Sequence, residues 1–123
     1  MSKILIIDNN IDLPWGLCAD FRRYLSGRVS VRRAPQQDLP TSPGGFSHII
    51  ISGSKTSILE NSPWIEELVK FVRRAVDASI PTLGICYGHQ IIAKSFGGSN
   101  AVRRAPFPEF GWVEIEKVGA SPI

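Results

Sequence analysis

The chain has 123 residues, of which 43% are hydrophobic and 20% charged. A length of this order is typical of one domain, and we expect a single domain over residues 1–123. The composition excludes a disordered tail, a collagen-like repeat and a low-complexity linker. The formal net charge is only +3, and the arginines occur in scattered pairs without the clustered basic face of a nucleic-acid-binding protein. We therefore expect no nucleic-acid partner.

The two cysteines, Cys18 and Cys86, are too few for a disulfide scaffold, which favours free thiols in a reducing compartment. Only four apolar residues, 4–7, precede Asp8, so the chain does not open with a secretory signal. No run approaches the ~18 uninterrupted apolar residues that a membrane helix requires. These features predict a cytoplasmic protein without membrane contact.

Two kinds of hydrophobic pattern define the expected elements. Residues 4–7 and 49–51 are apolar at every position, which suits strands covered on both faces, as in a parallel sheet. Apolar residues recur every three or four positions at 13–25 and 65–76, which indicates helices. In chain order we expect a strand at 3–7, a helix at 13–25, strands at 29–31 and 48–51, a helix beginning at 63, a strand at 80–85 and a helix at 88–96.

This alternation predicts an α/β fold, a mostly parallel sheet flanked by helices. Ser62 and Pro63 have the residue types of an N-cap and a first helical position. Pro81 suits the start of a strand, where no backbone donor is needed. Beyond Gly98 the pattern changes, and residues 101–104 and 111–118 are expected to form short antiparallel strands.

One motif carries chemistry, namely Gly84-Ile85-Cys86-Tyr87-Gly88 between a strand and a helix. A nucleophile on a sharp strand-to-helix turn has strained backbone geometry, and glycine on both sides removes side chains that would clash. The helix N-terminus would favour the thiolate of Cys86, and the Tyr87 N–H would bind an oxyanion. The alternative is a buried structural thiol, which is our expectation for Cys18.

A second oxyanion donor has to come from another strand end. The turn Ser52-Gly53-Ser54 is the best candidate, because Gly53 lets the backbone approach a ligand closely. Asp8 could bind a ligand at a strand end, but an Asp-Asn-Asn turn explains it as well, and we favour the turn. We expect the arginine pairs to be solvated, no metal or cofactor to be bound, and the tryptophans to serve packing: Trp15, Trp64 and Trp112.

The segment from Gly84 to Gln90, followed by Gly97-Gly98, resembles the elbow of the class I (triad type) glutamine amidotransferases. Residues 50–54 resemble the oxyanion loop of that family, and 109–112 its strand after the glutaminase helix. The family loop usually has two glycines and a proline, whereas this chain has Gly53-Ser54-Lys55, a variant similar to the standalone, GMP-synthase-like branch. The resemblance covers essentially the whole chain and implies a flavodoxin-like α/β fold.

By this resemblance, Cys86 would attack the side-chain amide of glutamine or of a γ-glutamyl small molecule, form a glutamyl thioester and release ammonia. The ammonia would pass to a synthase domain or subunit. The implied site comprises a nucleophile, its oxyanion and substrate contacts, and two supporting glycines: Cys86; Gly53, Ser54, Tyr87 and Gln90; Gly84 and Gly88.

The family places its catalytic His and Glu, as His-x-Glu, well downstream of the cysteine, and no such pair follows Cys86 here. Of the two histidines, His48 begins a buried strand on the wrong side of the sheet order, and His89 lies on the elbow helix. We therefore expect the N-terminal part of a C-terminally truncated domain, without glutaminase turnover. The alternatives are an inactive binding or regulatory chain, or a γ-glutamyl hydrolase or peptidase relative.

A phosphoacceptor receiver domain has a similar length and a similar first strand. It requires a phosphorylatable aspartate at the end of the middle strand and a lysine at a later strand end. Here these strands end in Ser52-Gly53 and in the Cys86 elbow, so the receiver interpretation fails.

Overall fold

The structure, a computed structural model, describes residues 2–12 and 17–120. Its centre is a four-stranded parallel sheet with the strand order β2-β1-β3-β4. The strands are β1 (Lys3–Asp8), β2 (Arg28–Arg33), β3 (His48–Ile51) and β4 (Thr82–Gly84). The helices are α1 (Leu17–Arg22), α2 (Pro63–Asp77) and α3 (Tyr87–Gly97), with short 3-10 helices at Ala34–Gln36 and Gly98–Ala101. The expected fold class, an α/β sheet flanked by helices, is confirmed.

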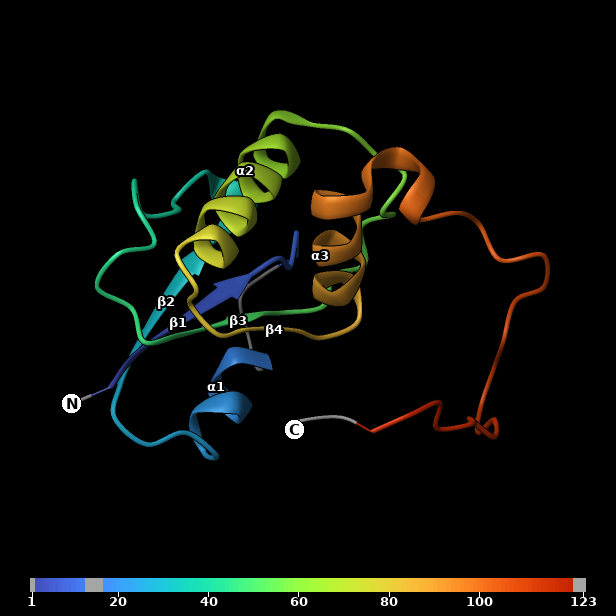
Figure 1. Cartoon of the computed structure of the whole chain (residues 1–123), viewed down its shortest axis with the longest axis horizontal. Coiled ribbons are helices and arrows are strands. Elements are labelled where there is room, and N and C mark those ends of the chain that lie inside the picture. Colours follow the sequence, from blue (N-terminus) through green and yellow to red (C-terminus); the bar gives the residue numbers. More distant parts are fainter. Residues whose placement is uncertain (1, 13–16, 121–123) are drawn as a thin grey trace.

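The helices lie on both faces of the sheet (Figure 1). α2 and α3 cover one face, and α1 lies on the other. Alternate strand residues face α2 and α3, because successive side chains of a strand point to opposite sides. The core between sheet and helices contains buried aliphatic and aromatic side chains: Leu5, Ile7, Ile49, Ile51, Ile65, Leu68, Phe71, Val72, Tyr87 and Ile91.

Most of the expected elements are present, with shifted ends. The helix expected at 13–25 is described from Leu17 and ends at Arg22, while residues 13–16, with Trp15, lie outside the described residues. Ser62 has the extended backbone of an N-cap, but its hydroxyl makes no capping hydrogen bond. Pro81 precedes β4 and is not its first residue.

The expected antiparallel strands at 101–104 and 111–118 are wrong. Residues 102–120 contain no strand, and this segment loops outward beyond α3 and turns back without joining the sheet (Figure 1). Trp112 is fully exposed, so the expectation that it packs in the core is also wrong. The alternating pattern was insufficient because a strand needs a hydrogen-bonding neighbour, and the described residues offer this segment none.

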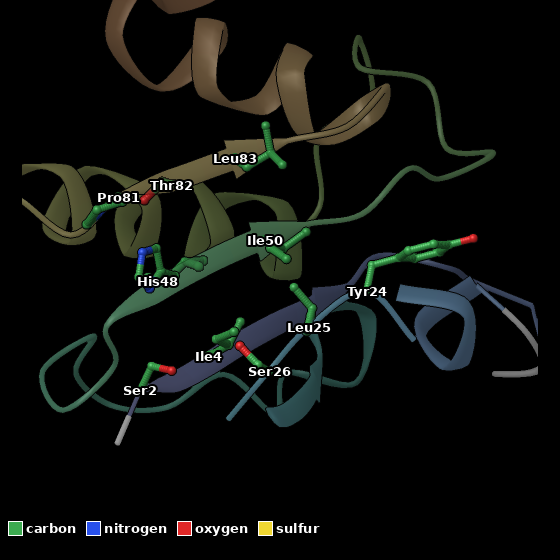
Figure 2. A pocket seen from close by; sticks show the side chains of 11 residues that line it. Ser2, Ile4, Tyr24, Leu25, Ser26, His48, Ile50, Pro81, Thr82 and Leu83 are labelled. Atoms are coloured by element: carbon green, nitrogen blue, oxygen red, sulfur yellow. The ribbon is translucent and has the colours of Figure 1, made fainter. Parts of the chain in front are cut away.

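A pocket of about 450 Å³ lies on the sheet face opposite α2 and α3 (Figure 2). Ile4, Ile50 and Leu83 form its floor, and Tyr24 and Leu25 contribute from the segment after α1. It is a largely apolar hollow beside the strands. Among the helices of the described residues, none has the length and apolar character to cross a bilayer.

Candidate active site at the carboxyl ends of the strands

Cys86 occupies a sharp turn between β4 and α3. Its backbone has φ 55° and ψ −112°, a conformation that L residues rarely adopt. The turn is anchored by hydrogen bonds from the Ile85 N–H to the Ile51 carbonyl and from the Gly88 N–H to the Ile85 carbonyl, both 3.0 Å. Cys86 is exposed and forms no disulfide. The turn therefore presents a free thiol at the N-terminus of an 11-residue helix.

The two flanking glycines fill positions where no other residue fits. A Cβ on Gly84 would lie 2.5 Å from the carbonyl atoms of Gly88. A Cβ on Gly88 would lie 2.2 Å from the Ile51 oxygen. Because these neighbours are backbone atoms, they cannot move aside as a flexible side chain would. The first turn of α3 thus packs directly against the end of β3.

Gly53 belongs to the loop that follows β3 and lies beside the cysteine. A Cβ placed on it would stand 3.4 Å from the Cys86 Cβ and 3.9 Å from the sulfur. Within the described residues, neither the Gly53 N–H nor the Tyr87 N–H donates to a protein acceptor. Fold and sheet order thus bring together a thiol and two unpaired N–H groups from separate strand ends.

The Tyr87 side chain anchors the first turn of α3 in the core. It is 1% exposed, and its ring centroid lies 6.3 Å from that of Trp64, which is partly buried as expected. Its hydroxyl finds no hydrogen-bond partner among the described residues. Burial and the nearby charge of Glu60 raise the pKa of Tyr87 to about 12. The tyrosine therefore stays neutral at physiological pH, and its side chain belongs to the core.

Ser54 and Gln90 are less closely tied to the thiol. The Ser54 hydroxyl donates to the Thr56 hydroxyl at 3.0 Å and accepts the Thr56 N–H at 3.1 Å, so it braces its own loop. Gln90 lies exposed on the first turn of α3, where its N–H donates to the Cys86 carbonyl at 3.2 Å. Its side chain is available for a ligand at the surface.

Neither histidine forms a dyad with the cysteine in the structure. His48 lies at the amino end of β3, the end opposite Cys86 in a parallel sheet, and is exposed, with Nδ1 3.0 Å from the Ser47 hydroxyl. His48 therefore begins β3, as expected, and lies at the end of the strand away from the elbow. His89 is exposed on α3. In residues 2–12 and 17–120, no group of three or more His, Cys, Asp or Glu could hold a metal ion.

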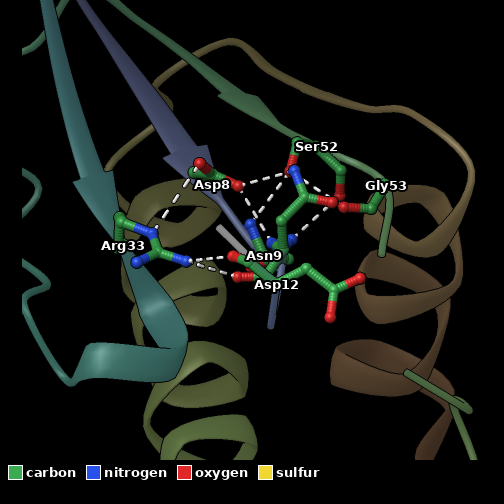
Figure 3. Close-up of polar contacts among 7 residues, drawn as sticks. Asp8, Asn9, Asp12, Arg33, Ser52 and Gly53 are labelled. Carbon is green, nitrogen blue, oxygen red and sulfur yellow. Dashed lines mark hydrogen bonds and ion pairs between the residues drawn. The ribbon is translucent and has the colours of Figure 1, made fainter. Parts of the chain in front are cut away.

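The sequence analysis missed a buried polar link between β1 and β3 (Figure 3). Asn9 is fully buried; its N–H donates to the Ser52 hydroxyl and its Nδ2 to the Ser52 carbonyl, both at 2.9 Å. The Ser52 hydroxyl in turn donates to the Gly53 carbonyl at 3.0 Å. The available signal was an asparagine after one apolar run and a serine after another, since the carboxyl ends of parallel strands meet at one edge.

Asp8 forms the expected turn and has a further partner. Its Oδ1 accepts the N–H and the Nδ2 of Asn10, both at 2.9 Å. Its Oδ2 lies 3.9 Å from Nε of Arg33, whose Nη2 also donates to the Asn10 and Asp12 carbonyls (Figure 3). The expectation that the arginine pairs are solvated is wrong for Arg33, which is half-buried because it binds these groups at the strand ends.

Comparisons with known proteins identify the family and the fold. Residues 5–118 match the family model "Glutamine amidotransferase class-I". A glutamine amidotransferase-like protein of Schizosaccharomyces pombe is 45% identical over 64 residues, 50% of this chain and 24% of that protein. Gamma-glutamyl peptidase 4 of Arabidopsis thaliana is 33% identical over 78 residues, 63% of this chain and 31% of that protein. The glutamine-hydrolysing GMP synthase of Aeropyrum pernix is 37% identical over 78 residues, 63% and 13% of the two chains.

A solved structure shares the fold. The glutamine amido transferase of Methylobacillus flagellatus superposes with a TM-score of 0.66 at 28% identity, over 79% of this chain and 39% of that one. The chain thus spans less than a third of these three curated relatives and about two fifths of this solved structure. The family match extends over nearly the whole sequence, from the first strand to the segment after α3. The chain belongs to the class I glutamine amidotransferase family.

Proposed function

We propose that Cys86 is the nucleophile of a glutaminase site. Its thiolate attacks the carbonyl carbon of the glutamine side-chain amide, and a C–S bond forms while the carbonyl oxygen becomes an oxyanion. The oxyanion collapses, the C–N bond breaks, and a glutamyl thioester and ammonia result. The observation that carries the proposal is the exposed thiol in a strained turn beside the N–H groups of Gly53 and Tyr87, which have no acceptor among the described residues.

The two N–H groups would bind the oxyanion, which is the charge that develops in the transition state. Gln90, exposed one turn along α3, and Ser54, in the loop after Gly53, are proposed to line the bound glutamine. Gly84 and Gly88 support the site, because they allow the turn to pack against β3. Each proposed role thus corresponds to a position at the same edge of the sheet.

The leaving nitrogen has to gain a proton, and this requires a general acid. His48 lies at the opposite end of the strands, and neither histidine is part of a His-x-Glu sequence. We propose that residues outside this sequence supply the acid, as the family resemblance implies. The 123 residues would then hold the nucleophile and oxyanion donors of a divided site.

The ammonia would serve an acceptor bound on a synthase domain or subunit. The relatives named as glutamine-hydrolysing GMP synthases support this assignment. A second candidate is hydrolysis of a γ-glutamyl peptide bond, favoured by the relative named gamma-glutamyl peptidase 4. Both reactions share the thioester and differ in the leaving amine.

The test is covalent labelling of the 123-residue chain with the diazoketone analogue of L-glutamine, in which a diazomethyl group replaces the amide nitrogen. The diazo carbon would take up the proton of the Cys86 thiol, and the sulfur would displace N₂ to form a C–S bond. The analogue then stays attached through a methylene group, which peptide mass spectrometry locates. We expect labelling at Cys86, protection by excess L-glutamine and none by D-glutamine, and no adduct in Cys86→Ala.

Labelling at Cys18 instead, or labelling at Cys86 that L-glutamine does not slow, would contradict the glutaminase proposal. Stronger protection by a γ-glutamyl dipeptide than by L-glutamine would favour the peptidase. This comparison separates the two candidates, because the compound that protects Cys86 better is the one that binds the site more tightly.

A further inference from the structure

The peptide between Ser52 and Gly53 lies just beyond the paired part of β1 and β3. The β1–β3 pairing ends at Ile7 opposite Ile51, and the Ser52 N–H still donates to the Ile7 carbonyl at 3.0 Å. The Ser52 carbonyl has no backbone donor from β1 among the described residues. Nδ2 of Asn9 takes that place at 2.9 Å. The asparagine side chain therefore continues the hydrogen bonding of the sheet by one peptide.

The direction of this hydrogen bond fixes the direction of the next N–H. The carbonyl and N–H of a trans peptide point in opposite directions, and no cis peptide bond occurs in the described residues. Asn9 follows β1 on one side of β3, and Cys86 follows β4 on the other side. With the Ser52 carbonyl directed to Asn9, the Gly53 N–H is directed to the side of Cys86.

The surroundings of Asn9 indicate a positioning role. Its Oδ1 is buried and has no partner among the described residues, and burial of an unpaired oxygen lowers stability. Nδ2 of the same amide holds the peptide before Gly53 through the Ser52 carbonyl. The Ser52 hydroxyl accepts the Asn9 N–H and holds the peptide after Gly53 through the Gly53 carbonyl. The Asn9 side chain thus lowers stability through its unpaired Oδ1, while its Nδ2 orients the loop.

We infer that Asn9 is a positioning residue for the oxyanion site: its hydrogen bond to the Ser52 carbonyl aims the Gly53 N–H at the oxygen of a substrate attacked by Cys86. The inference rests on the proposed role of Cys86 as a nucleophile toward carbonyl carbon. It adds the residue that follows β1 to a site otherwise formed by the ends of β3 and β4. Asn9 itself does not touch the substrate.

The experiment compares two reactions of the same thiol in the 123-residue chain. With p-nitrophenyl acetate, the Cys86 sulfur attacks the ester carbonyl through an oxyanion, forms a thioester and releases p-nitrophenolate, a leaving group that needs no general acid. With iodoacetamide, the sulfur displaces iodide from a saturated carbon and no oxyanion forms. Rates measured on Cys86→Ala are subtracted in both cases.

In Asn9→Ala we expect acylation to slow by about tenfold to a hundredfold, below or near the 10²–10³ that loss of a whole oxyanion donor costs. The alkylation rate should stay within about twofold of the parent chain, because its transition state has no oxyanion. The matched control is Asn10→Ala, which removes the neighbouring side-chain amide and with it only the hydrogen bond from Nδ2 to Asp8. It should leave both rates unchanged.

Equal slowing of both reactions, or of neither, would overturn the inference. If Asn9→Ala is unfolded at the assay temperature, Asn9→Asp decides, because it keeps the shape of the side chain and removes the amide that donates to the Ser52 carbonyl; acylation should again slow more than alkylation. Failure of the diazoketone labelling together with Asn9-dependent acylation would refute glutamine as the substrate and leave this inference standing.

Discussion

The carbonyl oxygen of Ile51 and the α-carbon of Gly88 are so close that a Cβ at residue 88 would lie 2.2 Å from the oxygen. Ile51 is the last residue of β3, and its oxygen also accepts the Ile85 N–H at 3.0 Å. The Ile51 carbonyl thus accepts a hydrogen bond from the residue before Cys86, and it leaves no room for a side chain at residue 88. The position of the thiol depends on this contact between β3 and α3.

Gly88→Ala should destabilise the chain by about 1–3 kcal/mol, because the added methyl group meets backbone that cannot yield. Urea unfolding followed by circular dichroism measures the change. The control is Gly44→Ala, whose new Cβ would meet only the flexible Ser42 hydroxyl, at 3.3 Å; it should change the free energy of unfolding by less than about 1 kcal/mol. Equal stability of the two variants would contradict the close packing of α3 on β3.

Gly53→Ala should fold and yet react poorly. The new Cβ makes ordinary contacts with the Cys86 side chain, 3.4 Å from its Cβ and 3.9 Å from its sulfur. It would occupy the space through which the substrate carbonyl approaches, so we expect diazoketone labelling to slow by about tenfold. Gly44→Ala again serves as the control. Unchanged labelling in a folded Gly53→Ala chain would place the substrate elsewhere.

Tyr87→Phe should change the pH dependence of stability. The unfolded chain loses the tyrosine proton at its ordinary pKa of about 10, whereas burial and Glu60 raise the pKa of Tyr87 in the folded chain to about 12. Between about pH 10 and pH 12 the tyrosine is ionised in the unfolded state and still protonated in the folded state. Rising pH therefore stabilises the unfolded state more, and the free energy of unfolding falls over this range. Below about pH 9 this contribution is constant.

Urea titrations of both chains across this range should show a smaller decline for Tyr87→Phe. At neutral pH the variant should be as stable as the parent chain or more stable by up to about 1 kcal/mol, because it loses a buried hydroxyl that has no partner in the described part of the chain. Labelling of Cys86 should persist, since the backbone N–H remains. A marked loss of stability at neutral pH would instead reveal a partner for the hydroxyl.

The 123-residue chain should form a covalent adduct at Cys86 without sustained release of ammonia from glutamine. A thiolate can attack unaided, but each turnover requires a proton for the departing nitrogen and an activated water for the thioester. A continuous ammonia assay with Cys86→Ala as the blank measures this. Steady release that disappears in Cys86→Ala would show that the chain holds its own acid, and His89→Ala would then test the nearer histidine.

The order of strands and helices could be predicted from the sequence because it depends on neighbouring residues. Fully apolar runs at 4–7 and 49–51 suit only strands covered on both faces. The elbow could be predicted for the same reason, since Gly84, Cys86 and Gly88 lie within five residues of one another. The family resemblance rested on these local motifs and is confirmed over residues 5–118.

Local pattern was insufficient where a residue needs a partner from elsewhere in the chain. Residues 111–118 alternate like a strand, yet no described strand lies beside them to complete their hydrogen bonds. Arg33 belongs to a pair expected to be solvated, but the parallel pairing of β1 and β2 places it opposite Asp8. In both cases the outcome depended on which strands became neighbours.

By itself, the sequence determined the order of the elements as far as the helix after Cys86, the turn that carries Cys86 and the membership of the family. Only the tertiary structure decided that Gly53 lies beside the thiol and that Asn9 holds the peptide before it. Asn9 and Ser52 are 43 positions apart, and their hydrogen bonds exist because parallel pairing sets Ile7 opposite Ile51. Such register is a property of the assembled sheet, since no single segment contains both hydrogen-bonding partners.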